Sequence, residues 1–410
     1  MSGLLSGYRI IESSMLLNGA TTGMMLADLG ADVIKVESPS LGDYIRLPET
    51  RHLHLQTNKS KRSLALDLKQ EEGRDIFFRL LAGADAIVTN AVADRNDRLG
   101  IGYDQVRARK PDIVYCQNTG FGATGPYREL PAHGQMMDAI AGAMPVRLDV
   151  DGLVKPSDAY TPRTGSLATA GEATSMGAIY AAFHIAAALA RRERTGEGSY
   201  IDISSAHAAL ASAWVAAITQ LNRPERRGWW QEPANLRPVA RYQAYLARDG
   251  KFLLFCPEER KFWHTFCDLV GRQDLKSEER GEPLRREIQA ILKTRDRDDW
   301  IALAKQYRLP IGPIHDGIEE VRGDEQISGR GVFVVGEADG DPFIYIGQPA
   351  IVDGGEWPIP AAAPELGQHN EELLVELGYS VSDIARLTDH RVISAPMQAN
   401  HISSSIYGEE

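Results

Sequence analysis

The phrase NKSKRSLALDL, from Asn58 to Leu68, concentrates positive charge immediately before an apolar strand. Lys59, Lys61 and Arg62 stand there among small polar residues. A loop of this kind at the edge of a strand can meet phosphate oxygens with charge-assisted hydrogen bonds. The phrase therefore predicts a local anion site in a chain that is acidic overall.

His133, in the phrase LPAHGQMM, is a second residue that could do chemistry. An imidazole with a pKa of about 6.5 takes up and releases protons at neutral pH, so His133 could act as a general acid and base. The alternative is a histidine that is hydrogen-bonded at the start of a helix and takes no part in a reaction. The sequence leaves both interpretations open.

Glycines at positions 120, 122 and 125 have the spacing of the dinucleotide fingerprint, but their surroundings do not fit it. Pro126 follows the third glycine where a helix should begin, and the motif follows the fourth expected strand rather than the first. No acidic residue ends a matching second strand. The sequence therefore argues against NAD binding.

The composition of the chain is that of a globular protein. It has 410 residues, of which 43% are hydrophobic and 25% charged, and a net charge of −11. This acidic balance argues against nucleic acid or an anionic membrane surface as the main partner. Cys116, Cys256 and Cys267 lie in apolar runs without the spacing of metal ligands, so we expect reduced core cysteines and no metal site.

The sequence shows no targeting or membrane segment. The first residues, MSGLLSGYRIIE, lack a basic segment followed by an apolar one, and no run of about 18 apolar residues occurs in the chain. We therefore expect a cytoplasmic protein without a membrane partner.

The candidate residues need a scaffold, and the stretch from Tyr8 to Leu68 predicts how it begins. Strands at 9–11 and 32–37 flank an apolar helix that Gly30 ends. Helical segments and strands keep alternating up to a strand at 112–117. This alternation favours a parallel sheet covered on both faces, in an α/β, Rossmann-like domain.

The remaining pattern predicts the domain organisation. The large domain comprises residues 1–222, including an apolar helix at 170–192, and a linker rich in Pro, Arg and Trp follows at 223–240. A small α+β domain at 241–328 begins with a hairpin that turns at Asp249-Gly250. The last part, 329–410, returns to the large domain and ends in a tail.

Three motifs carry a resemblance to a known family: LADLGADVIKVE at 26–37, S-P-x-x-G-D-x-x-R at 38–46, and N-K-x-K-R-S-x-A-L-D-L at 58–68. Together they resemble the class III CoA-transferases, or CaiB/BaiF family. This family includes formyl-CoA and carnitine CoA-transferases, benzylsuccinate CoA-transferase subunits and methylacyl-CoA racemases. The resemblance extends over almost the whole chain.

The resemblance implies that coenzyme A or an acyl-CoA is a substrate, together with a carboxylic acid, and that no cofactor is permanently bound. It also implies a Rossmann-like large domain, a small α+β domain and an interlocked dimer of two ring-like chains. The residues that we expect to contact CoA are Arg46, Lys59, Lys61, Arg62, Asn90, Arg98 and Leu99.

The chain departs from the family at the residue that performs the transfer. In the family's transferases a nucleophilic Asp lies ten residues before the glycine that corresponds to Gly177, and this position is Leu167 here. Racemases place their Asp there or one residue earlier, at Ser166. An alkyl side chain cannot form an anhydride or a thioester. Asp158 and Glu172 are the nearby carboxylates that could replace the missing one.

Three functions stay open on this evidence. The chain could be a CoA-transferase subunit without the nucleophile, in a heterodimer with an Asp-bearing paralogue rather than in a homodimer. It could be an acyl-CoA racemase, isomerase or lyase that uses His133 as acid and base. It could also bind CoA esters without catalysis.

Overall fold

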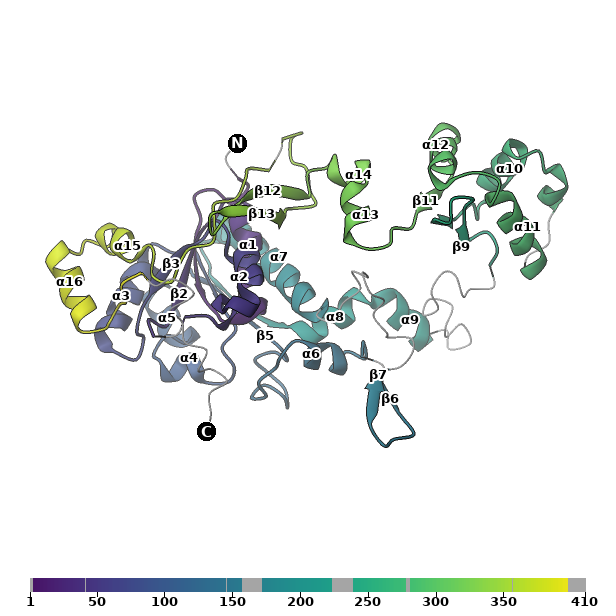
Figure 1. Ribbon diagram of the computed structural model, residues 1–410. Coiled ribbons are helices and arrows are strands. Elements are labelled where there is room, and N and C mark those ends of the chain that lie inside the picture. The colour runs from purple at the N-terminus through teal and green to yellow at the C-terminus, as the bar shows by residue number, and fades with distance from the viewer. Residues whose placement is uncertain are drawn as a thin grey trace. The chain divides into compact units, whose positions relative to one another are not determined.

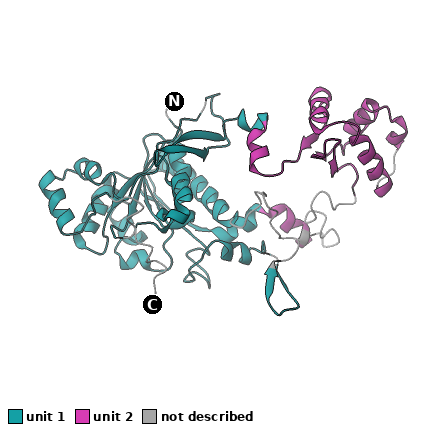
Figure 2. Ribbon diagram, viewed as in Figure 1, with its two compact units in different colours: residues 1–162, 168–212, 325–410 teal, residues 163–167, 213–324 magenta. Residues whose placement is uncertain are grey.

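The computed structural model describes residues 3–40, 42–144, 146–156, 172–222, 239–277, 281–355 and 357–396. Its contacts divide the chain into two compact units (Figure 2). Unit 1 comprises residues 1–162, 168–212 and 325–410, and unit 2 comprises residues 163–167 and 213–324. Each unit has a hydrophobic core of its own.

Unit 1 is built on a sheet of six parallel strands in the order β3-β2-β1-β4-β5-β8 (Figure 1). The chain starts in the middle with β1, moves outward to β3, and then crosses back to β4 on the other side of β1. The strand order therefore reverses between β1 and β4, and the predicted parallel sheet is confirmed. The strands are β1 Arg9–Ser13, β2 Asp32–Glu37, β3 Arg62–Ala65, β4 Ala86–Thr89, β5 Val114–Thr119 and β8 Ser199–Ser204.

Helices cover both faces of this sheet because its strands are apolar on both sides. Ile10 and Ile11, which are neighbours on β1, are both fully buried but belong to different cores. Two helices pack on the face of Ile10, α1 Leu16–Asp28 and α7 Glu172–Thr195. The other face carries α3 Glu71–Ala82, α5 Tyr103–Arg109, α15 Asn370–Glu376 and α16 Val381–Asp389.

The helix α7 is long and apolar enough to cross a membrane by length and composition, a test that buried core helices also meet. Ala181, Ile185 and Leu189 on α7 are buried in the same core as residues of β1, β4 and β5. This packing accounts for one face of α7, while Ile179 and Phe183 on the helix remain exposed.

The C-terminal segment returns to unit 1 and packs beside β3. The side chain of Asn370 accepts a hydrogen bond of 2.8 Å from the backbone of Ala65, and Leu66 forms an isolated bridge with Ile393. Because α15 and α16 also place Leu373 and Leu387 in the core, the sheet is covered only when both ends of the chain are present.

Unit 2 contains an antiparallel sheet in the order β11-β10-β9, packed against helices. The predicted hairpin at Asp249-Gly250 is confirmed, and Gly250 adopts a φ of 80° that a residue without a Cβ tolerates. Trp263 and Trp300 are buried in its core. The elements are β9 Gln243–Leu246, β10 Phe252–Phe255, β11 Ile311–Pro313, α9 Trp214–Asn222, α10 Arg260–Leu269, η6 Gln273–Ser277, α11 Glu282–Leu292, α12 Arg297–Tyr307 and α13 Ile318–Gly323.

The three cysteines are free thiols: Cys116 and Cys267 are buried, and Cys256 is partly buried.

Unit 1 also contains shorter elements between the main strands and helices. The shorter elements are η1 Tyr44–Arg46, η2 Pro48–Thr50, α2 Arg51–Asn58, α4 Arg95–Arg98, α6 Gln135–Ile140, β6 Val146–Leu148, β7 Val154–Pro156, α8 Ser205–Ser212, α14 Glu325–Ser328, β12 Phe333–Ala338 and β13 Asp341–Ile346.

Candidate functional site

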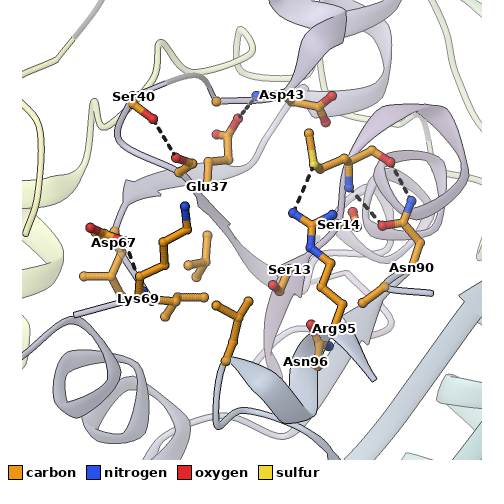
Figure 3. Close-up of a pocket in the computed structure, with 18 of the residues that line it drawn as sticks. Ser13, Ser14, Glu37, Ser40, Asp43, Asp67, Lys69, Asn90, Arg95 and Asn96 are labelled. Carbon is orange, nitrogen blue, oxygen red and sulfur yellow. Dashed lines mark hydrogen bonds between the residues drawn. The ribbon is translucent and has the colours of Figure 1, made fainter. Parts of the chain in front are cut away.

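A cavity of about 310 Å³ opens at the carboxyl ends of β1, β2, β3 and β4 (Figure 3). Its walls include residues that come shortly after these strands, such as Ser14, Ser38, Lys69 and Asn90. We call it the strand-end cavity. In open parallel sheets, ligands bind outside the carboxyl ends of the strands where the strand order reverses, and β1 and β4 are that point here.

Two cations line the strand-end cavity without a carboxylate partner. Lys69 follows β3 and Arg95 begins α4, and both are exposed in the cavity (Figure 3). Among the residues that the structure describes, neither side chain forms an ion pair; the Arg95 guanidinium lies 3.8 Å from the sulfur of Met15. Neither residue was predicted from the sequence. The cavity thus offers two unneutralised charges to an anionic ligand.

A larger cavity of about 1120 Å³ adjoins the first and shares Met15, Tyr44, Asn90 and Arg95 with it. We call it the loop cavity because the loop after β5 forms one of its walls. His133 lies on that wall. The cavity with Lys69 and the cavity with His133 are therefore neighbours, and Arg95 lines both.

Arg46 has a different place from the one predicted. It is fully buried and forms two hydrogen bonds with Glu37, of 2.8 and 2.6 Å, and a third of 2.9 Å with the carbonyl of Pro364. Burial alone would raise the pKa of Glu37, but the Arg46 guanidinium lowers it to about 2. Since its charge is neutralised inside unit 1, Arg46 is not free to meet a phosphate.

The cluster Lys59, Lys61 and Arg62 is likewise directed into the protein. Lys61 is buried and donates to Glu12 at 2.6 Å, and burial lowers the pKa of Lys61 to about 8. Lys59 is also buried and pairs with Asp28. These contacts do not support the predicted anion site at this loop, because each of the three cations already pairs with a carboxylate.

Arg62 forms the exposed part of this cluster. Its guanidinium pairs with Asp32 at 2.6 Å and with Glu372 and Glu376 of α15 at 2.8 and 2.6 Å. These pairs connect β3 to the C-terminal segment. Like the other two cations of the cluster, Arg62 lines neither the strand-end cavity nor the loop cavity.

Asn90, Arg98 and Leu99 do lie at the cavities. Leu99 lines the strand-end cavity and Arg98 the loop cavity, while Asn90 borders both. Arg98 forms an exposed pair with Asp94, one turn away on α4, and such pairs hold their partners weakly. These three residues lie at the end of β4 where the two cavities adjoin, and their contact with CoA stays a prediction.

His133 is exposed in the loop cavity, and within the described ranges its ring has no hydrogen-bond partner. The alternative of a histidine hydrogen-bonded at a helix start is therefore not what the structure has. Across the same cavity, Tyr200 donates to Gln117 at 2.8 Å. Burial and the nearby Asp202 raise the pKa of Tyr200 to about 12, so its phenol keeps its proton at neutral pH.

The position of the missing nucleophile, Leu167, lies outside the described residues, as do Ser166 and Asp158. Glu172 is the exposed first residue of α7 and lines none of the cavities described above. The start of this helix is met by a different carboxylate, Asp138 of α6, which is buried and accepts a hydrogen bond of 2.9 Å from the backbone of Ala173.

CoA-transferase family III matches residues 5–370 of this chain. The chain belongs to this family. It is 30% identical over 400 residues to a succinate–glutarate CoA-transferase of Agrobacterium fabrum, with 91% of this chain and 95% of that protein covered. It is 31% identical over 405 residues to a succinyl-CoA:mesaconate CoA-transferase of Haloarcula hispanica, with 92% and 97% covered.

Two further proteins add to the comparison. The chain is 29% identical to the BbsE subunit of succinyl-CoA:(R)-benzylsuccinate CoA-transferase from Thauera aromatica, with 93% of this chain and 96% of the subunit covered. A solved CaiB/BaiF family protein from Brucella suis is 27% identical, with a TM-score of 0.71, 92% of this chain and 100% of that chain covered. The function is accordingly that of a class III CoA-transferase, which uses CoA thioesters as substrates.

Proposed function

We propose that the strand-end cavity holds the phosphates of CoA and that the loop cavity holds the thioester end. The observation that carries this proposal is the pair of unneutralised cations, Lys69 and Arg95, at the point where the strand order reverses. CoA has a phosphorylated nucleotide at one end and an acyl thioester at the other. Two adjoining cavities, one with free cations and one with His133, suit those two ends.

We propose succinyl-CoA as the CoA donor and a dicarboxylic acid as the acceptor, in the cytoplasm. Relatives named for glutarate, mesaconate and (R)-benzylsuccinate support this choice. Arg98 and Arg128 also line the loop cavity, and in the described part of the chain each pairs with an exposed carboxylate near it in sequence. The second carboxylate of an acid could take the place of either weak partner.

Transfer requires a carboxylate that this chain lacks at its usual position. The carboxylate attacks the acyl carbon, CoA thiolate leaves, and a mixed anhydride forms; the thiolate then attacks the enzyme's acyl carbon and releases the acid. The second acid attacks the resulting enzyme thioester by the same steps in reverse. Because Leu167 can do none of this, we propose that a sister chain with Asp supplies the carboxylate in an interlocked heterodimer.

A second candidate is an acyl-CoA racemase or isomerase, and the observation that favours it is the unpaired His133 in the loop cavity. An exposed imidazole there could remove the proton on the carbon beside a thioester and return it. This activity needs no carboxylate nucleophile. It predicts uptake of deuterium at that carbon, which transfer does not.

Mass spectrometry separates these functions. The purified chain, alone and co-expressed with an Asp-bearing paralogue, is incubated with succinyl-CoA and trapped with hydroxylamine or borohydride. We expect the paralogue alone to be modified, only when this chain is present, and not when its Asp is changed to Asn. An adduct on this chain by itself would place the nucleophile at a carboxylate such as Asp158 or Glu172.

The remaining outcomes are equally distinct. CoA binding with neither an adduct nor transfer, in any combination of chains, would identify a non-catalytic CoA-ester binding protein. Deuterium uptake that Gln in place of His133 abolishes would identify the racemase. The stoichiometry of the co-expressed complex, measured by native mass spectrometry, tests the heterodimer against a homodimer.

A further inference from the structure

The turn between β1 and α1 contains a backbone conformation that its sequence does not favour. Leu16, the first residue of α1, has a φ of 60°, in the left-handed region that residues with a Cβ rarely adopt. Met15, just before it, is extended and caps α1 without a side-chain hydrogen bond. A strained residue persists only where its surroundings hold it, so contacts outside the turn must do so.

Asn90 makes contacts of that kind. Its Oδ1 accepts a hydrogen bond of 3.1 Å from the backbone N–H of Met15, and its Nδ2 donates one of 2.6 Å to the carbonyl of the same residue (Figure 3). Since an N–H and a carbonyl face the two ends of the amide, the amide can adopt only one orientation. Asp43 completes the arrangement by accepting a hydrogen bond of 2.8 Å from Leu16 N–H.

The turn forms part of both cavities. Met15 lines the strand-end cavity and the loop cavity, and Leu16 lines the loop cavity. The sulfur of Met15 also lies 3.8 Å from the guanidinium of Arg95 (Figure 3). The conformation of this turn therefore affects the region where the two cavities adjoin and the position of the Arg95 guanidinium.

We infer that Asn90 is a positioning residue: it holds the Met15–Leu16 turn in its strained conformation and thereby shapes the passage through which CoA extends between the two cavities. This inference rests on the proposed function, because the ligand is CoA. It differs from the role predicted from the sequence, in which the Asn90 amide contacts CoA itself. The two roles make opposite predictions for a second substitution at Leu16.

The test measures the affinity for CoA by isothermal titration calorimetry in Asn90→Ala, Leu16→Gly, Leu16→Ala and the two double variants. Asn90→Ala should weaken binding about tenfold, the effect of roughly 1.4 kcal/mol. Glycine adopts a positive φ without strain, so Asn90→Ala with Leu16→Gly should regain most of that loss. Asn90→Ala with Leu16→Ala, which removes the same side chain but keeps the strain, should regain none.

Each other result decides the matter. If the glycine double variant binds as weakly as the alanine double variant, Asn90 acts by direct contact and the inference is wrong. If the wild-type chain does not bind CoA at all, the proposed function fails, and the inference fails with it. Where Asn90→Ala does not fold, Asn90→Asp replaces it, since Asp keeps the acceptor for Met15 N–H and loses only the donor.

Discussion

Lys69 and Arg95 differ from the buried cations of unit 1 in what surrounds them. Arg46, Lys59 and Lys61 pair with carboxylates that are themselves largely buried, so their charges are neutralised within the protein. Lys69 and Arg95 instead face an open cavity, and a ligand phosphate would gain charge-assisted hydrogen bonds there without breaking an existing ion pair.

We predict that Lys69→Ala and Arg95→Ala each weaken CoA binding about tenfold, because a hydrogen bond to a charged group contributes about 1.5–3 kcal/mol. The loss should shrink as salt concentration rises, since salt screens exposed charges. Calorimetric titrations at two salt concentrations measure both effects. The control is Lys110→Ala. Lys110 precedes β5 at the amino end of the strand, away from the strand-end cavity, so this variant should keep the wild-type affinity.

Wild-type affinity in either cavity variant would show that these cations do not meet the phosphates. The same titrations with dephospho-CoA would then show whether another residue does. A loss in the Lys110→Ala control of the same size would instead point to a general effect of net charge.

At the scale of elements, α7 and α8 meet at a glycine. A Cβ at Gly177 would lie 2.0 Å from the Oγ of Ser205, too close for any contact. Ser205 cannot easily turn away, because its hydroxyl forms hydrogen bonds of 3.1 Å with both Asn18 and Asn118. The close approach of α7 to α8 therefore depends on the absence of one methyl group at Gly177.

We predict that Gly177→Ala destabilises the protein by about 1–2 kcal/mol. Alanine favours a helix over glycine by about 1 kcal/mol, but forcing an extra carbon into a packed core costs about 1–3 kcal/mol, and the contact here is short. Urea unfolding followed by circular dichroism measures the difference. Gly323→Ala on α13, where the added methyl meets no atom within 4 Å, is the control and should not destabilise.

At the scale of the whole molecule, the two units differ in which parts of the chain supply their hydrophobic cores. Unit 2 has its own core in one continuous segment that runs to residue 324. Unit 1 is discontinuous, because Leu373, Leu387 and Val392 from the C-terminal segment complete the core that β1 and α3 begin. Folding of unit 1 thus requires the far end of the chain, whereas unit 2 contains what it needs.

We predict that residues 239–324 fold when they are expressed alone. Trp263 and Trp300 are buried in that core, so the isolated segment should show blue-shifted tryptophan emission and a cooperative thermal transition. In a chain truncated after residue 324, unit 1 should not fold, because it loses the core residues of α15 and α16, whereas the segment 239–324 should still fold. A segment 239–324 that remains unfolded would contradict this division.

The architecture of unit 1 and the family could both be predicted from local patterns in the sequence. Apolar strands alternating with amphipathic helices are local patterns, and β1, β2 and β5 overlap the strands predicted at 9–11, 32–37 and 112–117. The hairpin at Asp249-Gly250 was predictable for the same reason, since its turn is specified by two adjacent residues. The family motifs are also continuous stretches of sequence, and the match over residues 5–370 confirms them.

Which positive charges are free could not be predicted in this way, because it depends on how the chain folds. A lysine before a strand looks the same in sequence whether it meets a phosphate or a carboxylate. Lys61 is paired by Glu12, which lies 49 positions away, and Arg62 by Glu376, 314 positions away. Within the described ranges Lys69 and Arg95 form no ion pair, although Asp67 lines the same cavity and accepts a hydrogen bond from the backbone N–H of Lys69. Neutralisation depends on neighbours in space, and that is why the phosphate-binding candidates changed once the chain was folded.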